Sequence, residues 1–232
     1  MEKAVLRVPK YQEDTMNLNQ MVYASLASSL VLATGCDKGG SNFSILSTTS
    51  QFKHEVTYEP RKLDVLFVVD NSGSMSTSQT NLANNFPSFI NTFKSKGYDF
   101  KIAVTTTDAF YGDEFLSTNC SLCNTLQTRF KSSTNPPVYV LDKNTTALES
   151  AFAQNVAVGV AGSGDERAFA SMKAALNGPH NTGFYRAGAF LSVIIVSDED
   201  DFSHNSISFN ESYTNSGLYS ITSYKSFLQT FT

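Results

Sequence analysis

Two apolar runs constrain the fold of this chain more than any other feature of its sequence. Residues 63–69 (LDVLFVV) and 190–196 (FLSVIIV) are apolar almost throughout, which is typical of strands covered on both faces in a parallel sheet. Polar turn residues follow each run directly, and segments with a helical spacing of apolar residues alternate with the strand-like segments. This alternation predicts an α/β fold with a largely parallel central sheet.

The other segments of the chain supply the remaining strands and helices of such a sheet. Apolar residues recur at helical spacing after residue 74, and Pro87 is expected to kink this helix or to start a second one. A short alternating segment ahead of the first run is typical of an edge strand. The further strands are expected at 52–58, 99–107 and 138–141, and the further helices at 147–156, 165–176 and 218–231.

The size and the charge of the chain limit the classes of protein to which it can belong. With 232 residues, 41% of them hydrophobic and 16% charged, the chain is long enough for one domain with a substantial core and an additional processing segment. The formal net charge of −4 lacks the basic excess that binds phosphate backbones. Nucleic acid is therefore not an expected partner.

Three polar loops fall where parallel sheets carry their functional loops, at the carboxyl ends of strands. The motif Asp70-x-Ser72-x-Ser74 follows the first apolar run, Asp198 follows the second, and Ser163 lies in a Gly-Ser-Gly loop between them. Carboxylate and hydroxyl oxygens suit hard cations such as Mg²⁺, Mn²⁺ or Ca²⁺. Helix capping alone would explain Ser72 and Ser74, but the second Asp favours a divalent metal site.

The segment at 62–75 (KLDVLFVVDNSGSM) resembles the first strand and metal loop of the von Willebrand factor type A (VWA) domain family. The resemblance covers about residue 63 to the C-terminus and implies a Rossmann-like three-layer fold with a metal-ion-dependent adhesion site. Ser163 stands where the family usually has Thr, and Asp198 stands where the family has the Asp that ends its fourth strand. The metal ligands that the resemblance implies are Asp70, Ser72, Ser74, Ser163 and Asp198.

The same resemblance implies a function and additional secondary structure at the C-terminus. Domains of this family commonly use the ion, most often Mg²⁺, to bind an acidic side chain of a protein partner without catalysis. The family also continues with a strand and a helix beyond the helix expected at 218–231. The chain is therefore expected to be truncated at its C-terminus or to lack an edge strand.

Two other functions stay open from the sequence. One is a structural or assembly subunit that keeps the fold and binds through another surface. The other is a metal-dependent phosphohydrolase, whose Asp-x-Asp-x-Thr motif also follows a buried strand. That chemistry needs an acid/base carboxylate two residues after the nucleophilic one. Ser72 occupies this position, so the chain is not expected to be an enzyme.

The N-terminal residues have the features of a bacterial lipoprotein signal. Residues 21–35 are uncharged and mostly small or apolar, and they are too few to span a bilayer, which takes about 20 residues. The sequence ATGC at 33–36 resembles a lipobox, so we expect residues 1–35 to be removed and Cys36 to be lipidated. A short buried helix is the alternative. Residues 36–51 are rich in Gly, Ser and Thr and predict a flexible tether, which would hold the domain at a membrane of the bacterial cell envelope.

Two cysteines remain in the predicted domain at 52–232. Cys120 and Cys123 lie in a polar stretch at 108–137, which is long for a loop and is expected to be an insertion with some local structure. In an oxidising compartment their spacing favours a disulfide. Zinc would need a second pair of ligands, and a redox pair is expected after a strand, at the opening of a helix.

Two acidic segments have simpler interpretations. Asp165 and Glu166 are expected to open the helix at 165–176 and to stabilise it through its dipole. The acidic run at 199–201 (EDD) is expected to form a solvated loop around the metal.

Overall fold

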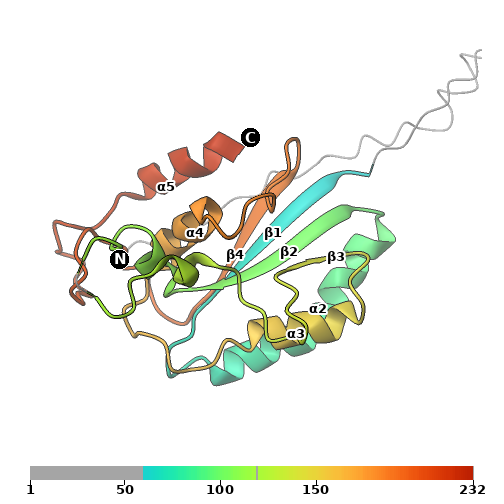
Figure 1. Cartoon of the computed structure of the whole chain (residues 1–232), viewed down its shortest axis with the longest axis horizontal. Coiled ribbons are helices and arrows are strands. Elements are labelled where there is room, and N and C mark those ends of the chain that lie inside the picture. The colour runs from blue at the N-terminus through green and yellow to red at the C-terminus, as the bar shows by residue number, and fades with distance from the viewer. Residues whose placement is uncertain (1–59, 119, 232) are drawn as a thin grey trace, which may run out of the picture. The chain divides into compact units, whose positions relative to one another are not determined.

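A four-stranded sheet organises the part of the chain that the computed structural model describes, residues 60–118 and 120–231 (Figure 1). The strands lie in the order β3-β2-β1-β4. β1 pairs in parallel with β2 and with β4, whereas β3 pairs antiparallel with β2. The predicted α/β fold with a mostly parallel sheet is therefore confirmed. The strands are β1 (Lys62–Val69), β2 (Asp99–Thr106), β3 (Val140–Asp142) and β4 (Phe190–Val196).

Helices cover both faces of this sheet, so the described residues form three layers. Figure 1 shows α2 and α3 on one face and α4 and α5 on the other. Pro87 lies inside α2 and does not divide it. The α-helices are α2 (Ser76–Ser95), α3 (Leu148–Val156), α4 (Ala168–Asn177) and α5 (Ile221–Leu228), and the 3-10 helices are η1 (Ala109–Gly112), η2 (Thr125–Thr128) and η3 (Gln229–Phe231).

β1 is the centre of the hydrophobic core because successive side chains of a strand point to opposite faces. Val65 and Phe67 belong to the core cluster on the side of α2 and α3, where Phe67 packs edge-to-face against Phe152 at 5.0 Å between ring centroids. Leu66 and Val68 belong to the cluster beneath α4 and α5. The uninterrupted apolar run of β1 thus reflects burial on both of its faces, as predicted.

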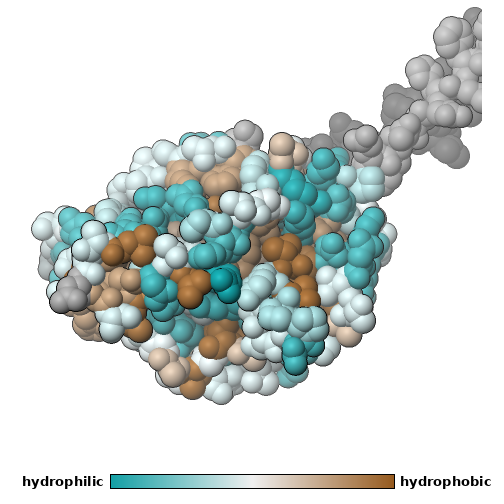
Figure 2. Space-filling model, in the orientation of Figure 1, coloured by the Kyte–Doolittle hydropathy of each residue, from teal (hydrophilic) through white to brown (hydrophobic). Residues whose placement is uncertain are grey.

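β4 differs from this prediction. It pairs only with β1 among the described strands and therefore lies at the edge of the sheet. Phe190 is 67% exposed and Ile195 is 38% exposed, and the other residues of β4 are half-buried. Apolar side chains thus reach solvent at this edge, and Figure 2 shows that further apolar surface is interspersed with polar surface on the face in view.

The predicted polar insertion at 108–137 contains η1 and η2 and packs against α4 through Phe110 and Phe115. Cys120 and Cys123 are joined in a disulfide with their Cα atoms 5.2 Å apart. Both cysteines pack against the small cluster formed by these aromatic residues.

The expected signal at 1–35, Cys36, the tether at 36–51 and the strand at 52–58 lie outside the described residues. Within 60–118 and 120–231, no helix has the length and apolar character needed to cross a membrane.

Candidate metal centre

The carboxyl ends of β1 and β4 bring two of the predicted ligands together. The two strands are parallel neighbours with Val69 opposite Val196, and the Asp70 amide continues the pairing by donating to the Val196 carbonyl at 2.9 Å. Asp70 and Asp198 therefore leave the sheet at the same edge, although they are far apart in the sequence. Strand register alone is responsible for this meeting.

The two serines of the first loop connect these carboxylates. The backbone amide of Ser72 donates to Asp70 Oδ1 at 2.7 Å, the hydroxyls of Ser72 and Ser74 lie 3.3 Å apart, and the Ser74 hydroxyl donates to Asp198 Oδ1 at 3.1 Å. α2 has Met75 at its N-cap and receives no side-chain capping bond there. The serine hydroxyls therefore face the carboxylates, which is the arrangement that the metal interpretation requires and helix capping does not.

A third carboxylate, from Glu166, completes the cluster. One oxygen from each of Asp70, Glu166 and Asp198 lies within 4.8 Å of the others. Ser197 joins two of them, because its hydroxyl lies 3.0 Å from Asp70 Oδ2 and 2.8 Å from Glu166 Oε2. Glu166 Oε1 is buried and has no hydrogen-bond partner among residues 60–118 and 120–231. An unpartnered buried carboxylate oxygen is costly unless a ligand or a proton satisfies it.

The expectation that Asp165 and Glu166 open a helix and stabilise it through its dipole is therefore wrong. α4 begins only at Ala168, so Glu166 precedes it, and its side chain is 2% exposed beside Asp70. A single sequence gives no direct signal for this role. The position of Glu166 just after the Gly-Ser-Gly loop and ahead of a helix was the only available hint.

A buried ion pair holds the backbone on either side of Glu166. The guanidinium of Arg167 is fully buried, pairs with both carboxylate oxygens of Asp165, and lies 4.5 Å from the ring centroid of Phe110. It also donates to the Ser206 carbonyl at 2.7 Å. Because both neighbours of Glu166 point into this network, the Glu166 carboxyl group is held on the opposite side, toward Asp70.

Ser163 is held by hydrogen bonds to Asp165 and Asp108. Its hydroxyl accepts a hydrogen bond from the Asp165 amide at 3.0 Å, and its own amide lies 3.3 Å from both oxygens of Asp108. None of its hydrogen bonds within the described residues joins it to the other four predicted ligands. The loop still packs tightly on the metal loop, because a Cβ at Gly162 would lie 2.2 Å from the Asn71 side chain.

The electrostatics of the cluster require either a proton or a cation to compensate its charge. Burial and the neighbouring Asp70 raise the pKa of Glu166 to about 8. No Lys or Arg in the described part of the chain forms an ion pair with Asp70, Glu166 or Asp198. Oxygen ligands of one Mg²⁺ or Ca²⁺ ion lie roughly 2.0–2.6 Å from it and hence at most about 5 Å from one another. The 4.8 Å limit on the three carboxylate oxygens fits this geometry.

Comparisons of the chain with protein-family models, curated proteins and solved structures found no match. The resemblance to the VWA family therefore rests on the segment at 62–75 and is carried forward as a proposal.

Proposed function

We propose that this protein is a VWA-type binding module in which a divalent cation, most favourably Mg²⁺, captures an acidic side chain of a protein partner. Mn²⁺ and Ca²⁺ have the same preference for oxygen ligands. The observation that carries the proposal is the convergence of Asp70, Glu166 and Asp198 with two serine hydroxyls at one edge of the sheet.

The burial of the ligands supports binding from one side. Asp70 and Glu166 are buried, whereas Asp198 is exposed. An ion held by these groups would be fixed from the interior and would reach solvent near Asp198. An incoming carboxylate is a hard oxygen donor that can complete the coordination on this open side.

A metal-dependent phosphohydrolase is the second candidate, because Glu166 supplies the carboxyl group that the sequence motif lacks. Its raised pKa suits an acid/base group. A nucleophilic Asp70 would have to reach the substrate, however, and Asp70 is fully buried with Oδ1 bonded to the Ser72 amide and Oδ2 to the Ser197 hydroxyl. This burial favours binding over catalysis. Turnover of p-nitrophenyl phosphate in Mg²⁺ that is lost in Glu166→Gln would instead support the enzyme.

Calorimetric titration with Mg²⁺ and Mn²⁺ tests the metal site. We expect wild-type protein to bind one ion, Asp70→Ala to lose binding by a factor of about 100 or more, and Glu166→Gln to bind more weakly because one ligand charge is removed. Glu149→Gln, which removes an exposed carboxylate on α3, is the matched control. Folded wild-type protein that binds neither ion, or unchanged binding in Asp70→Ala, would overturn the proposal.

Partner binding is tested by capture from the bacterial envelope with and without EDTA. We expect capture to require Mg²⁺ and to be lost in Asp198→Ala, while the circular dichroism spectrum of this variant stays unchanged. Capture that persists in EDTA would favour the structural or assembly subunit.

We further propose that the domain is anchored to a membrane of the bacterial envelope through a lipid on Cys36. The support is the apolar stretch at 21–35 with its lipobox-like end. Radiolabelled palmitate is expected to label wild-type protein and not Cys36→Ala. Equal labelling of the two proteins contradicts the anchor.

A further inference from the structure

A cleft of about 560 Å³ opens directly beside the metal centre. Glu166 and Ser197 line both the cleft and the metal centre, so the two share a wall. The rest of the lining comes from the end of β4, the start of α4 and the segment that leads into α5. Ser197 and Glu199, the two neighbours of Asp198 in the chain, line the cleft, so a ligand that reaches the ion near Asp198 lies next to it.

One part of the cleft is apolar. Phe169, Ile195 and Ile221 line it. Ile195 is 38% exposed and Ile221 is 74% exposed, so both present apolar surface that the described residues leave uncovered. This surface can pack against an aliphatic chain or a flat ring.

The other part of the cleft is acidic, and it contains no basic residue. Glu199, Asp200 and Asp201 line it, and no Lys, Arg or His is among the lining residues. Asp201 points into the protein, where it accepts hydrogen bonds from the amides of Phe169 and Ser203. Asp200 accepts a hydrogen bond from the Tyr213 hydroxyl. Across residues 60–118 and 120–231, neither Glu199 nor Asp200 forms an ion pair.

A buried, unpartnered carboxylate oxygen belongs to the same cleft. Glu166 lines it, and Glu166 Oε1 has no hydrogen-bond partner in the described part of the chain. The cleft thus combines an apolar wall, two surface carboxylates that form no ion pair among the described residues, and the Glu166 wall that it shares with the metal centre. An acidic or nucleic-acid segment would be repelled here, and a purely apolar group would strip water from the carboxylates without compensation.

We infer that the cleft receives a basic side chain, Lys or Arg, of the same partner whose acidic side chain binds the ion. Long basic side chains lay an aliphatic stem along apolar surface and keep a charged head near polar groups. The stem would pack on Phe169, Ile195 and Ile221, and the head would face Glu199 and Asp200. This inference rests on the proposed function, and it adds that the partner is recognised by an acidic and a basic residue together.

Fluorescence anisotropy with a set of short peptides tests the inference in the presence of Mg²⁺. Each peptide has blocked ends and carries one Asp and one Lys, separated by none to three glycines on either side. The matched peptides carry norleucine for Lys, which keeps the stem without the charge, or Asn for Asp. We expect at least one spacing to bind, and its norleucine counterpart to bind about tenfold more weakly.

Two protein variants locate this effect in the cleft. We expect the double variant Glu199→Gln, Asp200→Asn to lose the tenfold preference for Lys while it still binds one Mg²⁺ ion in calorimetry. Ile221→Ser is expected to weaken the Lys and norleucine peptides alike, because it removes part of the apolar wall. Glu149→Gln, on the distant helix α3, is expected to leave all affinities unchanged.

The outcomes separate this inference from the function on which it rests. Equal binding of the Lys and norleucine peptides, with binding lost in the Asn peptide, overturns the basic-residue cleft and leaves the metal-dependent function standing. Failure of every peptide to bind the Mg²⁺-loaded protein also overturns the inference. A second Mg²⁺ ion that disappears in the double variant would assign the cleft to a cation instead. Absence of Mg²⁺ binding to wild-type protein overturns the proposed function itself.

Discussion

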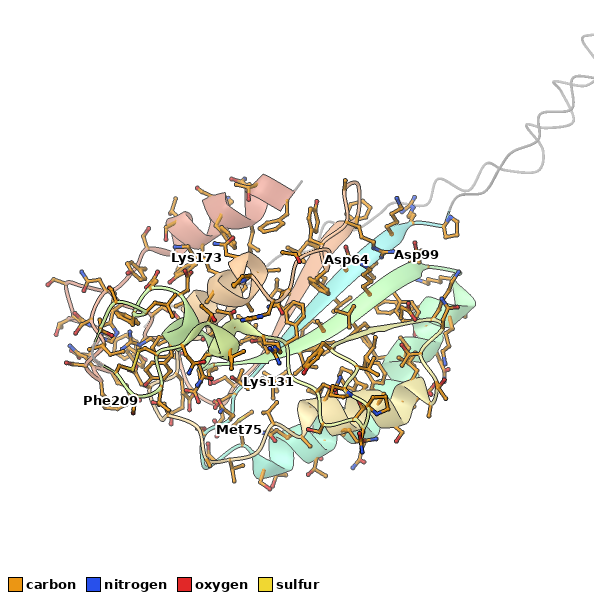
Figure 3. All side chains as sticks on the ribbon, viewed as in Figure 1. Asp64, Met75, Asp99, Lys131, Lys173 and Phe209 are labelled. Atoms are coloured by element: carbon orange, nitrogen blue, oxygen red, sulfur yellow. A yellow bond between two sulfur atoms is a disulfide. The ribbon has the colours of Figure 1, made fainter. Side chains whose placement is uncertain are left out.

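A buried aspartate stands at each end of β1. One has a positively charged neighbour and the other has negatively charged neighbours. Asp64 near the start of the strand and Asp70 just after its end are both fully buried. Asp64 is bound by Arg186, whose side chain lies 2.7 Å from Oδ1 and whose backbone amide donates to Oδ2 at 2.8 Å. Asp70 lies among the carboxylates of Glu166 and Asp198. Figure 3 shows Asp64 at the end of the sheet far from Met75, which follows the metal loop.

This comparison separates a buried charge that the fold itself compensates from one that it does not. A buried carboxylate is tolerated only when a cation, hydrogen bonds or a proton compensates its charge. At the start of β1 the fold itself provides the cation, so Asp64 is neutralised once folding is complete. At the end of β1 the fold provides further carboxylates, so neutralisation depends on a proton or on an ion from solution.

The largest effect is expected at the start of β1. Asp64→Ala removes a fully buried carboxylate, leaves the half-buried Arg186 without its main partner, and should lower the free energy of unfolding by about 3 kcal/mol. Urea denaturation measures this change. Asp99→Ala removes the other, more exposed partner of the same arginine and should cost at most about 1 kcal/mol. Mg²⁺ affinity should be unchanged in both variants, and a loss in Asp64→Ala would show that the two ends are coupled.

The next largest effect is expected from Mg²⁺ at the end of β1 that carries Asp70. An ion that binds only the folded protein stabilises it by about 2.7 kcal/mol at a concentration 100 times its dissociation constant. Thermal unfolding should therefore shift upward in Mg²⁺ and return to its original midpoint in EDTA. Asp64→Asn should retain the shift and Asp70→Asn should lose it. A shift that survives in Asp70→Asn would assign the ion to another site.

An effect that is smaller per pH unit, but is spread over several units, is expected from pH in metal-free protein. The pKa of Glu166 is raised to about 8 in the folded protein by burial and by Asp70, against an ordinary value of 4.5. Between these two values the folded state holds a proton that the unfolded state has lost. Stability from this group is therefore full below pH 4.5 and declines toward pH 8, by up to about 1.4 kcal/mol per pH unit. Denaturation of wild-type protein and Glu166→Gln in EDTA across this range isolates the contribution, and parallel pH profiles would contradict it.

The smallest effect is the change in stability of metal-free protein when either aspartate is replaced by Asn. We expect this change to have opposite signs at the two ends of β1. Asp70→Asn removes one of three neighbouring carboxylates and should stabilise the metal-free protein by about 1 kcal/mol, as replacements of strained functional groups often do. Asp64→Asn should destabilise it, because Arg186 loses its charged partner. Comparison of the two midpoints in urea with EDTA tests the sign. Destabilisation by Asp70→Asn would mean that the carboxylates are already compensated without a metal.

The sequence alone determined the elements whose pattern is local. The apolar runs predicted β4 at its observed bounds and β1 to within one residue. Burial on both faces accounts for the run in β1, whereas β4 is only half-buried at the edge of the sheet. The polar residues after these runs identified Asp70, Ser72, Ser74 and Asp198, since parallel strands end at the same edge of a sheet. Four of the five predicted ligands are therefore close together in the structure.

Features that depend on partners distant in the sequence emerge only when the chain folds. β3 is antiparallel, and β4 lies exposed at the edge, because strand order is a matter of pairing between segments. Glu166 turns toward Asp70 because the buried pair of Arg167 and Asp165 holds the backbone on either side of it, and the loop of Ser163 packs where Gly162 approaches Asn71. The charge on Asp64 finds Arg186, which is 122 residues away in the sequence. The sequence around a residue does not show which distant residue will contact it. How a buried charge is compensated is therefore visible only in the folded chain.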